Sequence, residues 1–311
     1  MADAQSAKPG GSVVFRLVVI LVALALVAGP FVLHLGQKRH NQLPFDVVAR
    51  FPDDKPIVGG EVFATTVAEI VDHELRGGTG WRPNDFILWG PTLWADNNAN
   101  RQLGIILAVR ESVRVFKDNL TKVSSDPYDD NLVAADTAFR NDAFKLWLPS
   151  AESKYAEGVK RLRAYVDGLK TTPMRSRPIN QRNQELIRLM QAWGDLLGDA
   201  HAALYRTPES FWRTDDDFYH AQGVAYVIYH LSRAIEREYR QALEAKPIIR
   251  TLFDEVATAL GQAAVLKPLI VFDGGPAGIF ANHRRNLDAY VNEARQKIYS
   301  IREELGPSTR P

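Results

Sequence analysis

The chain has 311 residues, with 38 basic and 37 acidic side chains, a net charge of +1 and no cysteine. The balanced charge argues against a nucleic-acid-binding protein, which needs a basic surface to displace counterions from phosphates. The absence of cysteine excludes disulfides, thiolate metal sites and a cysteine nucleophile.

The most apolar part of the chain lies near its N-terminus. Residues 17–33 carry no charge and consist almost wholly of Leu, Val, Ile, Ala and Phe. A helix rises about 1.5 Å per residue, so roughly 20 apolar residues cross a hydrocarbon core of about 30 Å. Residues 13–35 meet this length, and the apolar run continues past the small residues that could imitate a signal-peptidase site. We therefore expect a retained transmembrane helix at residues 13–35, after a short tail at residues 1–12.

The charges that flank this helix leave its orientation open. Lys8 and Arg16 lie on its N-terminal side, and Lys38 and Arg39 follow it, so the positive-inside rule leans slightly toward a cytoplasmic C-terminal part. A short tail before a large domain equally suits a signal anchor that exports the domain. The absence of cysteine and the family resemblance given below favour export, so we expect a single-pass protein of the bacterial inner membrane with a periplasmic domain.

Residues 36–60 are predicted to be a spacer between this helix and the rest of the chain. Pro44, Pro52 and Pro56 block a continuous helix and favour extended backbone. The apolar residues of 61–75 then recur with helical spacing, which predicts the first helix of a domain.

The most unusual segment is residues 79–104, TGWRPNDFILWGPTLWADNNANRQLG. It holds three of the six tryptophans, among Pro, Asn and Asp residues that are typical of turns. Tryptophan rings can stack on a sugar or a partner, and Asn and Asp supply directional hydrogen bonds. The candidate binding residues are Trp81, Asn84, Asp85, Trp89, Trp94, Asp96, Asn97 and Arg101.

Other interpretations of this segment compete with a binding surface. In a second interpretation the tryptophans are core residues that close the membrane-proximal end of the domain, with Asn and Asp as helix caps. In a third, they lie at a membrane interface, which tryptophan favours. An enzyme that acts on cell-wall glycan or lipid would need two carboxylates about 5–10 Å apart across a cleft, for which Asp85, Asp96 and Glu74 are the candidates. Catalytic residues stay unassigned. No metal-ligand spacing and no cofactor motif is present, so we predict neither a metal nor a cofactor.

From residue 102 onward, apolar residues recur in alternating steps of three and four, which places them on one stripe of a helix. The stripes of two such helices begin at Ile106 and Tyr155, and the residues of two further stripes are Leu186, Leu189, Trp193, Leu196, Ala200 and Ala203, and Leu287, Val291, Ala294, Ile298, Ile301 and Leu305. Stripes of this kind pack against each other in antiparallel bundles.

Less regular stripes lie at residues 132–146, 218–242 and 252–263, and only residues 268–272 fit a short strand or a buried connector. Ser150 is a predicted N-cap for the helix that follows it. The sequence therefore predicts an all-α protein, in which the transmembrane helix precedes a soluble antiparallel bundle of about seven helices at residues 61–305 and a tail at 306–311.

The chain resembles an uncharacterised family of proteobacterial membrane-anchored proteins. The resemblance rests on the block at residues 79–104, on LWLPSAESKY at residues 146–155 and on the N-terminal apolar segment, and it covers nearly the whole chain. It implies a bacterial cell-envelope setting and brings no known activity. We expect a non-enzymatic binding or scaffold module, held in the lipid bilayer through residues 13–35, with other envelope proteins as partners. The alternative is the glycan or lipid enzyme described above.

Overall fold

The structure is a computed structural model that describes residues 10–41, 45–85, 96–122, 126–208, 213–268, 270–275 and 279–306. Within these ranges the regular elements are helices, apart from one isolated β-bridge between Asp273 and Asn282. The all-α prediction is therefore confirmed.

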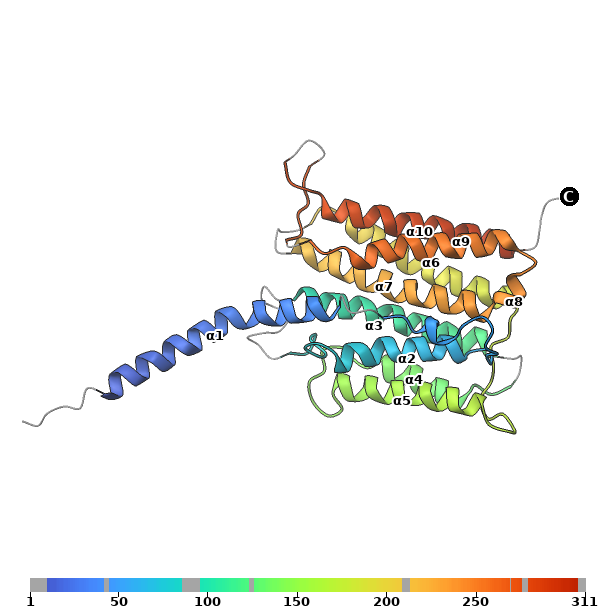
Figure 1. Ribbon diagram of the computed structural model, residues 1–311, viewed down its shortest axis with the longest axis horizontal. Helices are drawn as coiled ribbons and strands as arrows, with labels where there is room; N and C mark the ends of the chain where they lie inside the picture. The colour runs from blue at the N-terminus through green and yellow to red at the C-terminus, as the bar shows by residue number, and fades with distance from the viewer. Residues whose placement is uncertain are drawn as a thin grey trace, which may run out of the picture.

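A long helix, α1 (Gly10–His40), projects from one end of a helical bundle (Figure 1). In the described part of the chain the bundle has eight helices of ten residues or more, against about seven expected: α2 (Glu61–Arg76), α3 (Asn97–Val115), α4 (Asp130–Phe139), α5 (Ala151–Leu169), α6 (Asn183–Tyr205), α7 (Thr214–Glu238), α9 (Pro247–Val265) and α10 (His283–Leu305). Three short helical turns complete the chain: η1 (Val48–Arg50), a π-helical turn η2 (Phe116–Leu120) and α8 (Arg240–Leu243).

The bundle has two halves that meet at α3 and α7 (Figure 1). On one side, α2 and α4 pack against α5. On the other side, α10 packs against α6 and α9, and α7 contacts α9 and α6 as well as α3 and α2. Among the described helices, α3 and α7 make the most extensive contact.

The predicted apolar stripes form the core. The stripe of α10 is buried from Leu287 to Leu305, and that of α6 is buried from Leu186 to Ala200. Full burial of a side chain of this size contributes about 1.5–3 kcal/mol. Within the core, the indole N–H of Trp193 on α6 donates to Ser112 Oγ on α3 at 3.0 Å, which joins the two halves.

Two glycines allow α3 and α7 to approach closely. A Cβ atom at Gly104 would lie 2.0 Å from the carbonyl oxygen of His220, and a Cβ atom at Gly223 would lie 2.0 Å from that of Arg101. Both obstacles are backbone atoms of the facing helix, so any larger residue would push the helices apart. A glycine inside a helix costs roughly 1 kcal/mol relative to alanine, and this close packing explains why it is tolerated here.

Two helices end before the last residues of their predicted apolar stripes, which are Val123 for the stripe that begins at Ile106 and Leu146 for the stripe at 132–146. The α-helix α3 stops at Val115, and η2 follows, where the Thr121 amide donates to the carbonyl of Phe116 five residues earlier at 3.1 Å. The predicted helix at 132–146 ends at Phe139, where the chain turns and the Arg110 guanidinium binds the Phe139 carbonyl at 2.5 Å. The cap at Ser150 is confirmed, since its hydroxyl accepts from the Ser153 amide.

The N-terminal region lies partly along the bundle. Among the helices described, none is both long enough and apolar enough to cross a membrane. The residues from 45 to 60, which the sequence predicts to be a spacer, lie against α7: Val47 and Phe51 are buried there, and the Arg237 guanidinium binds the Phe51 carbonyl at 2.8 Å. The candidate strand at 268–272 is a connector between α9 and α10 where it is described.

Candidate functional site

The first part of the predicted binding segment is packed into the bundle. Trp81 is buried, its indole N–H donates to the Ala143 carbonyl at 3.0 Å, and its ring meets that of Tyr155 edge-on at 5.0 Å. The buried Asn84 amide donates to Glu152 at 2.9 Å. Both side chains therefore fasten this segment to α5 and to the connection between α4 and α5.

Asp85 forms an ion pair with Arg82 at 2.6 Å, and partial burial raises the pKa of its carboxyl. Trp89 and Trp94 lie outside the described residues, so their predicted role stays a prediction.

The second part of the predicted segment lies at the N-terminus of α3. Asp96 immediately precedes this helix, Asn97 begins it, and Arg101 is one turn further along, facing α2 and α7. The structure therefore divides the predicted set into a packed group around Trp81 and a polar group at the start of α3.

Arg101 belongs to a buried ion pair that links α3 to α2. Its guanidinium contacts Glu74 at 2.8 Å, with only 5% and 1% of the two residues exposed, and Gln102 donates to the same carboxylate at 3.1 Å. The guanidinium also covers the Tyr226 ring at 4.6 Å. Burial acts to raise the pKa of Glu74, but the charge and hydrogen bond of Arg101 outweigh it and lower that pKa. Glu74 is thus an enclosed carboxylate that holds helices together.

Three carboxyl groups gather where α3 and α7 begin. Burial and the neighbouring charges of Asp216 and Asp215 raise the pKa of Asp96 to about 8, and burial raises the pKa of Asp215 to about 6. Asn100 on α3 donates to Asp216 at 2.8 Å. Within the described ranges, no group of three or more His, Asp or Glu side chains is arranged to hold a metal ion.

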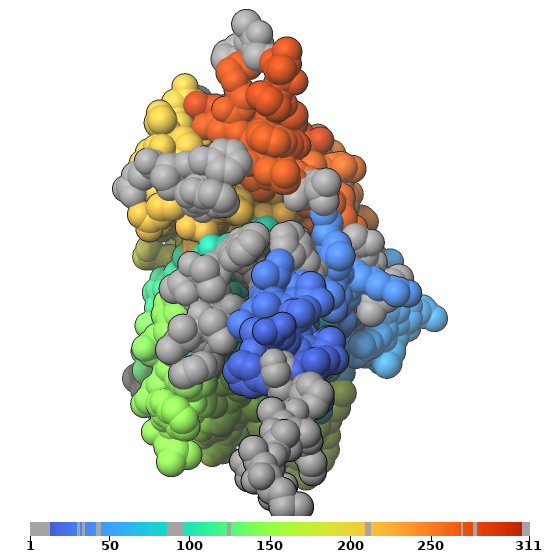
Figure 2. Space-filling model, turned by 90° about the vertical axis from the view of Figure 1, so that its left-hand side faces the viewer, coloured from blue at the N-terminus to red at the C-terminus, as the bar shows by residue number. Residues whose placement is uncertain are grey.

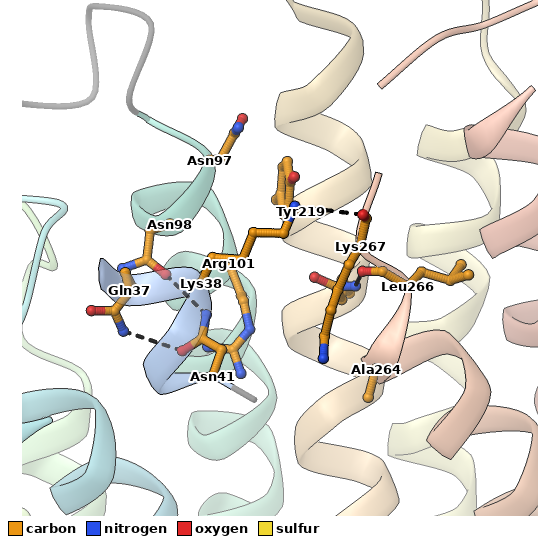
Figure 3. Close-up of a pocket in the computed structure, with 11 residues that line it drawn as sticks. Gln37, Lys38, Asn41, Asn97, Asn98, Arg101, Tyr219, Ala264, Leu266 and Lys267 are labelled. Carbon is orange, nitrogen blue, oxygen red and sulfur yellow. Dashed lines mark hydrogen bonds between the residues drawn. The ribbon is translucent and has the colours of Figure 1, made fainter. Parts of the chain in front are cut away.

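A small polar pocket opens beside this cluster, at the base of α1 (Figure 3). Its volume is about 40 Å³, which is room for a few waters or a small polar group and not for a sugar ring. The last turn of α1, the first turn of α3, α7 and the end of α9 contribute its lining: Gln37, Lys38 and Asn41; Asn97, Asn98 and Arg101; Tyr219 and Gln222; and Ala264, Leu266 and Lys267.

Hydrogen bonds tie the polar pocket to α1. The Asn41 amide donates to Asn98 Oδ1 at 3.4 Å, and the Gln37 amide donates to Asn41 Oδ1 at 3.2 Å. Lys38 reaches from α1 across the pocket toward the end of α9, where its ammonium lies 3.5 Å from the Lys267 carbonyl oxygen (Figure 3). The end of α1 therefore forms part of the wall of the polar pocket.

The polar pocket keeps unused hydrogen-bonding capacity and a positive charge. Asn98 is buried, and its Nδ2 has no hydrogen-bond partner in the described part of the chain; the same holds for Asn97 Oδ1. The Lys38 ammonium donates to the carbonyls of Lys267 and Pro268, at 3.5 and 3.3 Å, and neither it nor the Lys267 ammonium forms an ion pair with a described carboxylate. The pocket can therefore take a small group that carries hydrogen-bond acceptors and negative charge.

Sequence reasoning found only part of this pocket. Asn97 and Arg101 were predicted as binding residues, whereas Asn98, Gln222 and Lys267 were not. The adjacent asparagines at a helix start and the lysine just after the apolar run were the available signals, but nothing local indicates that residues 38 and 267 meet.

The fold and the pocket define an all-helical bundle protein with a projecting N-terminal helix. The chain belongs to DUF2333, a family of uncharacterised proteins conserved in bacteria, whose model matches residues 8–207 and 198–306. The match confirms the expected bacterial family without a known activity, while its restriction to proteobacteria and its membrane anchoring stay predictions. No curated protein and no solved structure matches the chain.

Proposed function

We propose that this protein is a membrane-anchored binding or scaffold module of the bacterial cell envelope, held in the bilayer by α1. One observation carries the proposal: the large apolar side chains of α1 from Val13 to Val27 are 38–68% exposed. Soluble proteins rarely leave apolar surfaces of this extent in water, so such a surface indicates insertion or a partner.

A bilayer accounts for this surface better than a protein groove does. The exposed residues surround α1 on all sides instead of forming one stripe, which is typical of a helix in lipid. The proposal that α1 spans the bilayer is also supported by the sequence of residues 17–33, which carries no charge. Some side chains of this range lie outside the described set. Export of the bundle to the periplasm is part of the proposal and is supported by the absence of cysteine.

Two measurements test the anchor. After alkaline carbonate extraction, the full chain should stay in the membrane fraction, and a reporter fused after Pro311 should be active only in the periplasm. The variant Leu21→Arg/Leu24→Arg should move to the soluble fraction, because each arginine at a helix centre costs about 2.5–3.5 kcal/mol of insertion free energy. Gly36→Arg is the matched control, since no atom lies within 4 Å of a Cβ there. Extraction of the unmodified chain by carbonate would refute the anchor, and a cytoplasmic reporter signal would refute export.

The polar pocket is the proposed ligand site of this module, and its chemistry suits a phosphate or carboxylate group. In neutral detergent, millimolar inorganic phosphate should raise the melting temperature of the full chain, and Lys38→Gln should remove this effect. Lys246→Gln is the matched control, because the Lys246 ammonium also donates to a backbone carbonyl, that of Glu304 at 3.1 Å, but near the start of α9. Equal stabilisation of both variants would exclude the pocket as the phosphate site.

One observation favours the enzymatic alternative. A carboxyl whose pKa is raised to about 8, as in Asp96, is suited to donate a proton near neutral pH, and such groups cluster at active sites. Unchanged growth and envelope integrity of a strain that carries Asp96→Asn would count against a catalytic role.

A further inference from the structure

Exposed apolar side chains outside α1 concentrate in two connections. In the loop from α4 to α5, Trp147 is 76% exposed and Leu148 is 96% exposed, and Phe144 and Leu146 are also exposed. In the loop from α9 to α10, Ile279 is 94% exposed, and Ile270 and Phe280 are exposed as well. Single exposed leucines are common on soluble proteins, but groups of this size with a tryptophan at their centre are not.

Both loops lie at the end of the bundle from which α1 emerges. α4 and α9 run toward this end and α5 and α10 run away from it, so the two connections flank the base of α1 (Figure 1). Figure 2 looks directly onto this end, with α1 pointing at the viewer, the start of α5 on one side and the segment before α10 at the top. The two loops and α1 therefore lie at the same end of the bundle.

The opposite end of the bundle differs. Among the described residues near it, the exposed large apolar side chains are Tyr128, Val133, Met174 and Ile248, and they are only 38–52% exposed. This contrast between the two ends indicates that the exposed apolar residues of the two loops form a contact surface.

The loops present these side chains on a hydrogen-bonded framework. In the first loop, the Ala151 amide donates to the Lys145 carbonyl at 2.9 Å. In the second loop, Asn282 donates to the Gly274 carbonyl at 2.7 Å, and the rings of Phe272 and Phe280 stack at 5.1 Å. The backbone is held by its own contacts, while the side chains of Leu148 and Ile279 are almost fully exposed.

We propose that this end of the bundle is a membrane-docking surface, and that both loops enter the interface of the bilayer in which α1 is anchored. Lys38 lies only three residues beyond Leu35, which is about 4.5 Å along a helix, so the bundle begins at the level of the lipid headgroups. Tryptophan favours this interface, and the exposed Arg39 and Lys267 supply charges that complement anionic headgroups. The inference rests on the proposed insertion of α1, and the occupant of the surface is the bilayer itself.

The cysteine-free chain allows a direct test by site-specific labelling. Leu148→Cys and Ile279→Cys would carry an environment-sensitive fluorophore at the tips of the two loops, in the full chain reconstituted into vesicles of phosphatidylethanolamine and phosphatidylglycerol. Ile248→Cys is the matched control, because Ile248 is an exposed isoleucine at the far end of the bundle. A nitroxide lipid should reduce emission about twofold at positions 148 and 279 and leave position 248 unchanged, since interfacial side chains lie about 5–10 Å into the headgroup region.

The outcomes separate failure of this inference from failure of the anchor. Carbonate extraction of the same labelled vesicles reports on α1 alone. If the chain resists extraction but lipid nitroxide quenches all three positions equally, or none of them, the docking surface is refuted while the anchor stands. Blue-shifted emission at 148 and 279 that lipid nitroxide does not quench would show a protein partner or a second copy on this surface, and would also refute the inference. Chain lost to the carbonate supernatant would refute the anchor and the inference together.

Discussion

Replacement of Glu74 by glutamine should destabilise the bundle strongly, because it leaves a buried guanidinium without its counter-charge. Glu74 and Arg101 are 2.8 Å apart and almost fully buried, and without the carboxylate Arg101 would rely on the ring and hydroxyl of Tyr226 to favour its charge. Loss of one partner from a buried pair costs about 3–5 kcal/mol. For a domain of this size, that corresponds to a fall in melting temperature on the order of 10 °C.

The assay is thermal and urea unfolding of the full chain in neutral detergent, followed by far-ultraviolet circular dichroism. The double variant Glu74→Leu/Arg101→Met should be less destabilised than the sum of its two single variants by about 2 kcal/mol or more, because it removes both charges together. Glu111→Gln is the control: Glu111 pairs with Arg114 at the same distance of 2.8 Å but is partly exposed, so its loss should cost at most about 1 kcal/mol.

The lowered pKa of Glu74 adds a dependence on pH with a defined sign. The pKa of Glu74 in the folded state lies below its ordinary value of 4.5. Its ionised carboxylate therefore stabilises the fold above pH 4.5, and this stabilisation is lost as the pH falls through the folded-state pKa. The acid limb of the stability curve should therefore be shallower in Glu74→Gln than in the unmodified chain. A Glu74→Gln variant within about 1 kcal/mol of the unmodified chain, or strictly additive single variants, would refute the structural role of this pair.

Three further changes test other parts of the structure by the same unfolding assay. Gly223→Ala should lower the free energy of unfolding by about 2–3 kcal/mol, because the new Cβ would meet the backbone of α3. The control Gly198→Ala should be neutral or slightly stabilising, because its Cβ faces only a flexible side chain. Equal effects of the two changes would contradict the close α3–α7 packing. Trp81→Phe should cost about 2 kcal/mol, because the buried Ala143 carbonyl loses its donor, and a stable variant that loses a binding activity would instead indicate a recognition residue. Burial raises the pKa of Glu238 from 4.5 to about 7, so its contribution to stability is present below pH 4.5 and is lost as the pH rises through 7. Glu238→Gln should therefore reduce the fall in stability between pH 5 and 8. Parallel curves of stability against pH for the variant and the unmodified chain would contradict this.

The helices and their buried faces could be predicted because both depend on local sequence. The apolar residues from Leu287 to Leu305 recur with helical spacing, and such a stripe is removed from water only when it faces the core. The same pattern therefore predicts both the helix and its buried face. Ser150 was equally predictable as a cap, because its hydroxyl binds an amide only three residues later. The all-α class follows from such patterns without knowledge of any partner.

The pairing of the helices and the polar pocket could not be predicted in the same way. All stripes look alike to a periodicity argument, and the close α3–α7 contact depends on two glycines 119 positions apart, Gly104 and Gly223. The Trp-rich segment was predicted as one candidate surface, yet Trp81 faces the α4–α5 connection whereas Arg101 faces Glu74. Long-range contacts of this kind decide which polar residues share a site, and no local pattern encodes them.

The junction between α1 and the bundle connects the proposed anchor, the polar pocket and the proposed docking surface. The side chain of Gln37 accepts from the Thr79 amide at 2.7 Å, and the His40 ring stacks on that of His73 at 4.1 Å, so the last turn of α1 is fixed to the end of α2. A fixed junction sets the angle between anchor and bundle, which is the condition for both apolar loops to reach the bilayer at once. A ligand in the pocket would contact α1 through Lys38 and α3 through its first turn, and would therefore strengthen the same junction. We therefore expect ligand binding to be coupled to the orientation of the bundle on the membrane. If docking of the loops raises the affinity of the pocket for its ligand, the ligand must stabilise the docked orientation by the same free energy.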